Sequence, residues 1–272
     1  MSRHGASMLE RVGAVARRDM RIQLSYQFGL LARFVEVVLF AATLFFISKL
    51  VQHPASLAPY GSDYFGFALV GVVVVSFSTL GLGAFTRTIS DEQTGGTLEI
   101  LLTAPVPLAV VLGGAFVVPL ALTAVEILIY GVAAALVGTH FALGGIVLAL
   151  PVLALTITSF CALGVVSAAF IVLTKRGDPF TILVTRVTTL LAGSLFPASV
   201  LPGWAQPLSR LVPAFYGLRA MRAALLAHAG VADIAGDVVV LAGFTLVLAP
   251  LSLLIFRRSL RVARVSGTLG SY

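Results

Sequence analysis

The chain alternates long apolar stretches with short polar connections, and five of these stretches contain no Asp, Glu, Lys or Arg. They cover residues 64–86, 100–125, 127–174, 187–209 and 238–256. Because a bilayer core needs about 20 apolar residues per helix, the stretch 127–174 is long enough for two crossings, divided at "GTHFALGG". With a further apolar segment near the N-terminus, the pattern predicts an all-α integral membrane protein with six transmembrane helices. We place them at about 28–51, 64–86, 106–137, 143–174, 180–197 and 234–256.

Composition agrees with a membrane protein and offers no catalytic motif. Hydrophobic residues make up 59% of the 272 residues and charged residues only 11%, against about 25% charged in soluble proteins. The single cysteine, Cys161, excludes a disulfide framework within one chain and is expected to be a small apolar filler. The chain has no nucleophile elbow, phosphate-binding glycine-lysine loop or HExxH motif. We therefore expect no catalytic, cofactor-binding or metal-ligating residues and no enzymatic activity of its own.

Basic residues gather on one predicted side of the membrane. Twelve of the 18 lie before the first helix, in the second and fourth connections, or after the last helix. The positive-inside rule then places both termini in the cytoplasm. This distribution also indicates a membrane protein rather than a nucleic-acid partner, despite the net charge of +7. The twelve residues are Arg3, Arg11, Arg17, Arg18, Arg21, Arg87, Lys175, Arg176, Arg257, Arg258, Arg261 and Arg264.

The two ends of the chain flank the membrane domain. Residues 1–27 contain a predicted amphipathic helix with basic residues on one arc and apolar residues on the other, which is typical of a helix in the membrane interface. A cleaved targeting segment is the alternative, but Glu10, Asp19 and the full-length span that follows argue against it. Residues 28–256 form the predicted six-span domain, and 257–272 a basic cytoplasmic tail.

The second connection, "RTISDEQTGGTLEILLTAP", predicts a cytoplasmic insert. Ser90 and Gln93 predict a first short turn, and Thr97 predicts the cap of a second helix after two glycines. Leu98, Leu101 and Leu102 share one face of that second helix at the spacing i, i+3, i+4. An apolar face on a cytoplasmic helix must be covered by lipid headgroups or by another protein.

The fifth connection, "PASVLPGWAQPLSRLVPAFYGLRAMRAALL", combines four prolines with apolar residues. Prolines break a straight helix, so the pattern predicts short re-entrant helices on the outer side over about 197–225. Trp204 and Tyr216 are expected at the depth of the membrane interface. The residues that mark this segment are Pro197, Leu201, Pro202, Trp204, Pro207 and Pro213.

Ionisable residues inside predicted spans are costly and need partners. Arg33 and Glu36 are three residues apart and can pair on one face, and Arg186 lies at about the same depth in its own helix. A cluster of these three residues is therefore allowed. Glu126 is predicted near the outer surface, with Lys49, Arg219 or Arg222 as partners. Two roles remain open for these charges, namely pairing between helices and lining a substrate path.

A family resemblance rests on two motifs and on the order of the predicted helices, insert and proline-rich segment. "EQTGGTLEILLTAPVP" (92–107) and "LFPASVLPGWAQPLSRLVPAFYGLRAMR" (195–222) resemble the patterns of the transmembrane subunit of ABC-2 type exporters, and the resemblance covers nearly the whole chain. It implies that the insert at about 92–105 is a coupling helix that docks on a separate ATP-binding subunit. The residues implied in coupling are Glu92, Gly95, Gly96, Thr97, Leu98, Glu99, Leu101, Leu102 and Pro105.

The resemblance also implies an assembly. The expected complex holds two ATP-binding subunits, which bind ATP and Mg, and a second permease chain that is identical or paralogous, in the bacterial cytoplasmic (inner) membrane. Glycans, lipids and amphiphilic drugs all remain open as substrates. The alternatives are a secondary carrier or channel independent of ATP, against which the lack of an internal repeat argues, and a membrane assembly protein that transports nothing.

Overall fold

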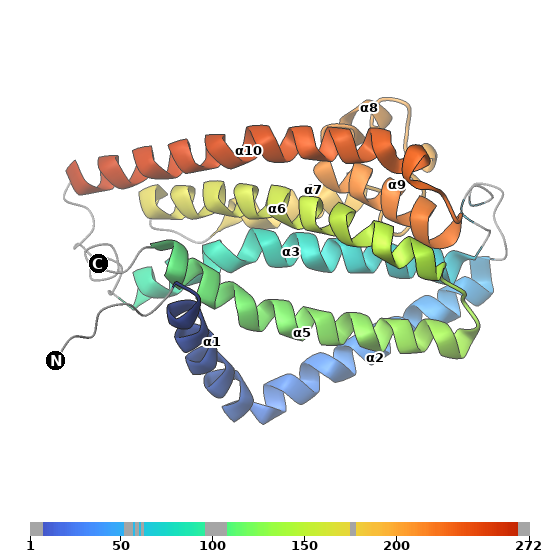
Figure 1. The fold of residues 1–272 in the computed structure, drawn as a ribbon, viewed down its shortest axis with the longest axis horizontal. Coiled ribbons are helices and arrows are strands. Elements are labelled where there is room, and N and C mark those ends of the chain that lie inside the picture. Colours follow the sequence, from blue (N-terminus) through green and yellow to red (C-terminus); the bar gives the residue numbers. More distant parts are fainter. Residues whose placement is uncertain are drawn as a thin grey trace.

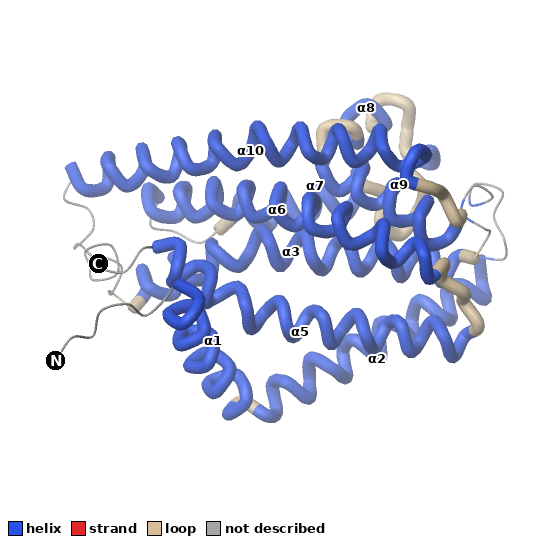
Figure 2. The backbone as a smooth tube through the Cα atoms, in the orientation of Figure 1, coloured by secondary structure: helices blue, strands red, loops and turns tan. Residues whose placement is uncertain are grey.

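The computed structural model describes residues 8–51, 57, 60, 63–95, 108–174 and 178–265, and this part consists of helices and their connections without a strand. Figures 1 and 2 show the long helices side by side, with α1 (Met8–Ser25) lying across one end. The long helices are α2 (Gln27–Val51), α3 (Tyr64–Thr94), α5 (Leu108–Val137), α6 (Leu143–Thr174) and α10 (Val231–Val265). The shorter elements are α7 (Pro179–Leu191), the 3-10 helix η2 (Ala198–Val200), α8 (Gln206–Ser209) and α9 (Pro213–Leu226).

Five described helices are long and apolar enough to cross a membrane, which confirms the prediction of a multi-pass all-helical protein. The predicted span at 180–197 is instead the shorter helix α7. Its 13 residues rise only about 20 Å at 1.5 Å each, against a hydrocarbon core of about 30 Å. The chain turns after Leu191, where Gly193 adopts a positive φ of 71°. This break comes before the first proline of the segment, so the prolines alone did not reveal it.

Helix α3 is longer than predicted because nothing in its sequence stops it. The Asp63 carboxylate accepts hydrogen bonds from the backbone N–H groups of Phe65 and Gly66 and so caps the start. No glycine or proline then occurs between residues 84 and 94, and the helix continues eight residues beyond the predicted end at 86. The first short turn predicted from Ser90 and Gln93 is therefore wrong, because both residues lie inside α3.

Helix α10 also extends beyond its predicted end. It continues to Val265, so the first part of the predicted tail at 257–272 is helical. Arg257, Arg258 and Arg261 lie on its last turns. The basic residues are compatible with this extension because Arg is a good helix former.

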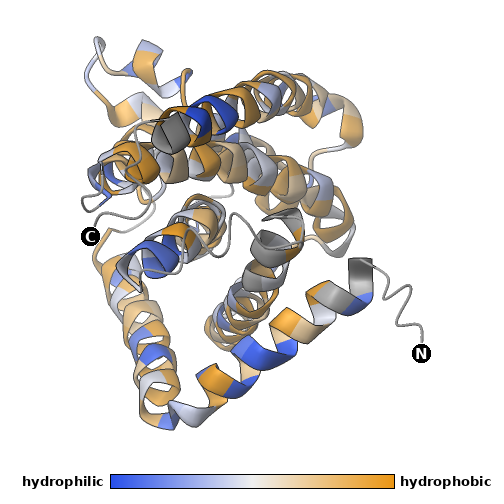
Figure 3. Ribbon diagram, turned by 90° about the vertical axis from the view of Figure 1, so that its left-hand side faces the viewer, coloured by the Kyte–Doolittle hydropathy of each residue, from blue (hydrophilic) through white to orange (hydrophobic). Residues whose placement is uncertain are grey.

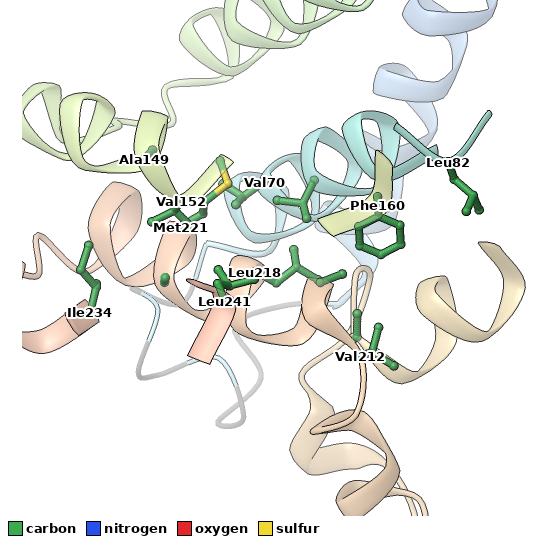
Figure 4. Close-up of a cluster of buried hydrophobic side chains, with 14 residues drawn as sticks. Val70, Leu82, Ala149, Val152, Phe160, Val212, Leu218, Met221, Ile234 and Leu241 are labelled. Atoms are coloured by element: carbon green, nitrogen blue, oxygen red, sulfur yellow. The ribbon is translucent and has the colours of Figure 1, made fainter. Parts of the chain in front are cut away.

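The core lies where α3, α6, α9 and α10 meet. Figure 4 shows side chains from all four helices converging there, among them Val70, Phe160, Leu218 and Leu241. Helices α3 and α6 approach closely because small residues face each other, as in many membrane helix pairs. A methyl group added at Gly164 would lie 2.6 Å from the Leu82 carbonyl oxygen. These contacts fix α3 at the centre of the bundle.

The outer surface is largely apolar. Figure 3, viewed from the α1 end, shows hydrophobic residues on the outer sides of the long helices, whereas hydrophilic and hydrophobic residues alternate along α1. Helix α1 packs against α5, with Val15 facing Gly114. Helix α2 has only three buried residues and packs on α3 and α5. Such a surface suits lipid or a second chain rather than water.

Candidate functional site

An ion pair joins α2 to α5 within their membrane-spanning parts. Nε of Arg33 donates a hydrogen bond to Oε1 of Glu126. The Glu126 side chain is 11% exposed and that of Arg33 is 38% exposed. The carboxylate is thus the more deeply enclosed partner, and the pair neutralises two charges that would each be costly alone.

This pairing corrects two predictions from the sequence. Arg33 does not pair with Glu36, and Glu126 does not contact Lys49, Arg219 or Arg222. The predicted depth of Arg33 in the membrane assumed that α2 starts at the end of the bundle. Figure 1 shows instead that α1 descends from that end and that α2 begins part of the way along α5. The first turns of α2 therefore reach the middle of α5.

Glu36 and Arg186 remain exposed on apolar faces. Within the described residues neither side chain forms an ion pair. Helices α2 and α7 each pack on α3, but they do not pack closely on each other. The cluster of Arg33, Glu36 and Arg186 that the sequence allowed is therefore not formed within one chain.

The predicted coupling residues lie at and beyond the end of α3. Glu92 lies on its last turn, and the Gly95 N–H donates to the Asp91 carbonyl oxygen at 2.9 Å. Gly95 has an ordinary right-handed φ of −75°, so it ends the helix without a sharp turn. The remaining predicted coupling residues lie outside the described residues: Gly96, Thr97, Leu98, Glu99, Leu101, Leu102 and Pro105.

A cavity of about 300 Å³ opens beside this end of α3, between α1, α3 and α5. Its charged lining mixes both signs, with Arg18 and Asp19 from α1 and Arg87, Asp91 and Glu92 from α3. On the last turn of α3, the Gln93 Oε1 atom is buried and accepts no hydrogen bond in the described part of the chain. Polar groups of α1 and α3 therefore gather at the α1 end of the bundle.

The proline-rich segment forms short helices, as predicted, but the prolines begin helices rather than break them. Pro197 precedes η2, Pro207 lies in the first turn of α8, and Pro213 begins α9. A missing N–H costs nothing at the first helical position, which explains this placement. Pro202 accepts hydrogen bonds in a turn that presents Trp204, which is 74% exposed. Leu201 ends η2. Whether the segment enters the membrane stays a prediction.

Arg222 on α9 joins three segments at the end of the bundle away from α1. Its guanidinium donates to the carbonyl oxygens of Phe67 (3.3 Å), Gly193 (2.9 Å) and Ser194 (2.6 Å). It also stacks over the Phe67 ring, 3.4 Å from the ring centre. The close approach needs Gly71, where a methyl group would lie 1.9 Å from the Ser194 carbonyl oxygen. Arg222 thus holds α3, α9 and the turn after α7 together.

Carbonyl oxygens replace a counter-ion for Arg222. The residue is only 3% exposed, and no carboxylate pairs with it among the described residues. Gly193 and Ser194 follow the C-terminal end of α7, where the helix dipole favours a cation. Burial lowers the pKa of Arg222 to about 9, which leaves it charged at neutral pH.

Arg219, one turn earlier, ties α9 to α10. Its Nε atom donates to both carboxylate oxygens of Asp237, at 3.0 and 2.8 Å, and its Nη2 atom donates to one of them. These hydrogen bonds raise the pKa of Arg219. Its guanidinium also lies 5.4 Å from the Phe215 ring centre and 5.7 Å from that of Tyr216. The Arg219 side chain is 50% exposed and that of Asp237 is 7% exposed.

The arginine pair of α9 was missed as a site from the sequence. Arg219 and Arg222 were considered only as partners for Glu126. Their spacing of three residues, which puts both on one face of a helix, was the available signal. The acceptors of Arg222 are backbone carbonyl oxygens from distant segments, and no pattern of residue types predicts such acceptors.

Comparison with known proteins gives one result. Residues 11–226 match the model of a family described as ABC-2 type transporter. The matched region spans α1 to the end of α9 and so includes the Arg33–Glu126 pair, the end of α3 and both arginines of α9. A search of curated proteins found no match.

Proposed function

This chain belongs to the ABC-2 type transporter family, and we propose from this premise that it is the transmembrane permease subunit of an exporter driven by a separate ATP-binding subunit. The observation that supports this most is the family match over most of the helical bundle. Two ATP-binding subunits, carrying ATP and Mg, would serve two permease chains. The cargo would be a glycan, a lipid or an amphiphilic drug moved outward across the bacterial cytoplasmic membrane.

The proposed orientation places the α1 end in the cytoplasm. Helix α1, the last turns of α3 and the end of α10 all lie at this end of the bundle in Figure 1. They bring Arg17, Arg87 and Arg257 to one side with several further arginines. An excess of basic residues on one side is typical of the cytoplasmic face. The proline-rich segment would then lie on the outer side.

The segment after Gly95 would transmit the force. This segment begins where α3 ends. A partner bound to the segment would therefore act directly on α3, which is the most buried of the long helices. Leu98, Leu101 and Leu102 would seat in an apolar groove of the ATP-binding subunit, as an amphipathic helix does in a cleft. Burying each leucine contributes about 1.5–3 kcal/mol.

Co-purification tests this coupling role. Leu101→Asp with Leu102→Asp places two charges in the proposed groove, and we expect normal membrane insertion but loss of the ATP-binding subunit in detergent and no export. Ile100→Asp with Thr103→Asp adds the same charges to the opposite side of the predicted helix and should retain the complex. If the Leu101→Asp and Leu102→Asp protein still carries the ATP-binding subunit, the docking role is wrong.

The second permease chain would pack on the exposed faces of α2 and α7. Glu36 lies on the exposed face of α2 with Val35 and Leu39, and Arg186 lies on that of α7 with Ile182 and Leu183. In a dimer with two-fold symmetry, both chains contribute the same surface patch. If an element of the first chain contacts a different element of the second, the reverse contact forms as well. Helix α2 of one chain would thus meet α7 of its partner, and the two opposite charges would neutralise each other inside the membrane.

Cysteine crosslinking tests this contact in a Cys161→Ala background. Glu36→Cys combined with Arg186→Cys should give a covalent dimer on mild oxidation, because a disulfide requires Cβ atoms about 3.5–4.5 Å apart. Each single cysteine variant should stay uncrosslinked. Leu128→Cys, on the exposed side of α5, combined with Arg186→Cys is the matched control. Equal crosslinking in the control would reject this interface.

A further inference from the structure

A cavity of about 270 Å³ lies at the end of the bundle away from α1, beside the arginines of α9. Its polar lining consists of Tyr60, Ser199, Arg219 and Arg222, and the rest is apolar. We propose that this cavity binds a single phosphate group, carried by an anionic lipid headgroup or present as free phosphate. The proposal does not depend on the ATP-binding partner.

The cavity carries an uncompensated positive charge. Asp237 pairs with Arg219, but Arg222 has only carbonyl oxygens as acceptors in the described part of the chain. Two guanidinium groups and one carboxylate leave one positive charge at the wall of the cavity. The carbonyl oxygens stabilise the Arg222 guanidinium but carry no net charge, so an anion in the cavity would supply the counter-ion that the described residues lack.

Donor groups remain available to such an anion. The bonds to Asp237 use Nε and Nη2 of Arg219, and its Nη1 atom donates no hydrogen bond among the described residues. Among the described residues, Arg222 uses one hydrogen of its Nη1 atom, for Gly193, and leaves the other free. The Tyr60 phenol lines the same cavity beside both guanidinium groups. Planar guanidinium groups suit the oxygens of a phosphate.

These donors are already fixed in place. The Phe67 ring and three carbonyl oxygens hold Arg222, while Asp237 and the rings of Phe215 and Tyr216 hold Arg219. Binding would therefore cost little side-chain entropy. The volume corresponds to roughly nine waters at about 30 Å³ each, which is enough for a phosphate with part of a headgroup. The apolar lining from Pro197, Ala198 and Leu218 would contact the remainder.

Thermal unfolding of the full chain in an uncharged detergent tests the site. One arm titrates phosphatidylglycerol into the micelles, with diacylglycerol as the phosphate-free lipid, and the other titrates sodium phosphate at constant ionic strength. We expect phosphatidylglycerol or phosphate to raise the unfolding midpoint and diacylglycerol to leave it unchanged. A shift with the lipid alone assigns the phosphate to a lipid headgroup, and a shift with phosphate alone assigns it to a soluble anion.

Variants distinguish binding in the cavity from a general effect of surface charge. Arg219→Gln with Asp237→Asn keeps a hydrogen-bonded pair and the net charge of the cavity but removes the guanidinium donors of Arg219, and Ala198→Leu fills the cavity without changing charge. Each should weaken the apparent affinity at least tenfold. Arg210→Gln, an exposed arginine of the same segment that does not line the cavity, should change it less than twofold. The proposal is overturned if neither probe shifts the midpoint, or if the Arg210→Gln protein loses as much affinity as the cavity variants.

Discussion

Removing Arg33 should destabilise the protein more than removing Glu126, because the two partners are unequally buried. Arg33→Leu leaves a carboxylate that is only 11% exposed without a cation, at a cost of about 3–5 kcal/mol. This corresponds to a loss of roughly 6–20 °C in unfolding midpoint for a chain of this size. Glu126→Gln leaves a long cationic side chain that is 38% exposed and can move toward the membrane interface. Its cost should be about 1–3 kcal/mol.

The double variant Arg33→Leu with Glu126→Leu completes the thermodynamic cycle. Replacing both charges by apolar groups should recover stability to within about 1–2 kcal/mol of the natural protein. The assay is thermal unfolding in detergent and again in lipid nanodiscs. The exposed pair Arg18–Asp19, with side chains 68% and 22% exposed, supplies the control, and Arg18→Leu should cost less than about 1 kcal/mol. If Arg33→Leu costs no more than Arg18→Leu, the pair does not stabilise the helices in the way argued.

Two further predictions concern topology and packing. In a Cys161→Ala background, Thr94→Cys should be shielded from an impermeant thiol reagent in intact cells and His140→Cys, in the connection between α5 and α6, should be labelled; the reverse pattern contradicts the proposed orientation. Gly71→Ala places a methyl group 1.9 Å from the Ser194 carbonyl oxygen and should cost about 1–3 kcal/mol or more by thermal unfolding. Gly131→Ala, whose new methyl group meets no described atom within 4 Å beyond its own turn of helix, should be neutral or stabilising, and equal losses in both variants would refute the packing argument.

The apolar pattern alone predicted most of the bundle, because spans are set by bilayer thickness and little else. Helices α2, α5 and α6 match their predicted bounds to within two residues where these fall on described residues. The errors concern the ends of helices, which the apolar pattern does not determine. Helix α7 stops early at a turn that is held by Arg222, from another segment. The end of α3 was predicted too early because its last turns carry polar residues, which are typical of a loop, although no glycine or proline ends the helix before Thr94.

Pairing of charges was the least predictable feature. Counting residues from the start of a helix gives depth only when the helix starts at the membrane surface. Helix α2 starts deeper, after the tilted α1, so the predicted partners of Arg33 and Glu126 were wrong. The arginine-lined cavity at α9 depends on carbonyl groups that every residue carries, and a sequence cannot show which carbonyls converge.

Helix α3 connects the two ends of the molecule, and this suggests how the force of the proposed ATP-binding subunit would cross it. Its 31 residues extend about 45 Å, from the proposed coupling segment to the Phe67 carbonyl oxygen that Arg222 holds. Helices α5, α6 and α10 each contain a proline, whereas α3 contains none. A displacement at Thr94 would therefore reach Arg222, α9 and the turn after α7 with little bending. Thr79→Pro, in the middle of α3, should introduce a kink at a cost of about 3 kcal/mol and uncouple ATP hydrolysis from export. Thr79→Ala is its control. With equal amounts of both variants in the membrane and the ATP-binding subunit retained, normal export by the Thr79→Pro protein would show that force does not travel along α3.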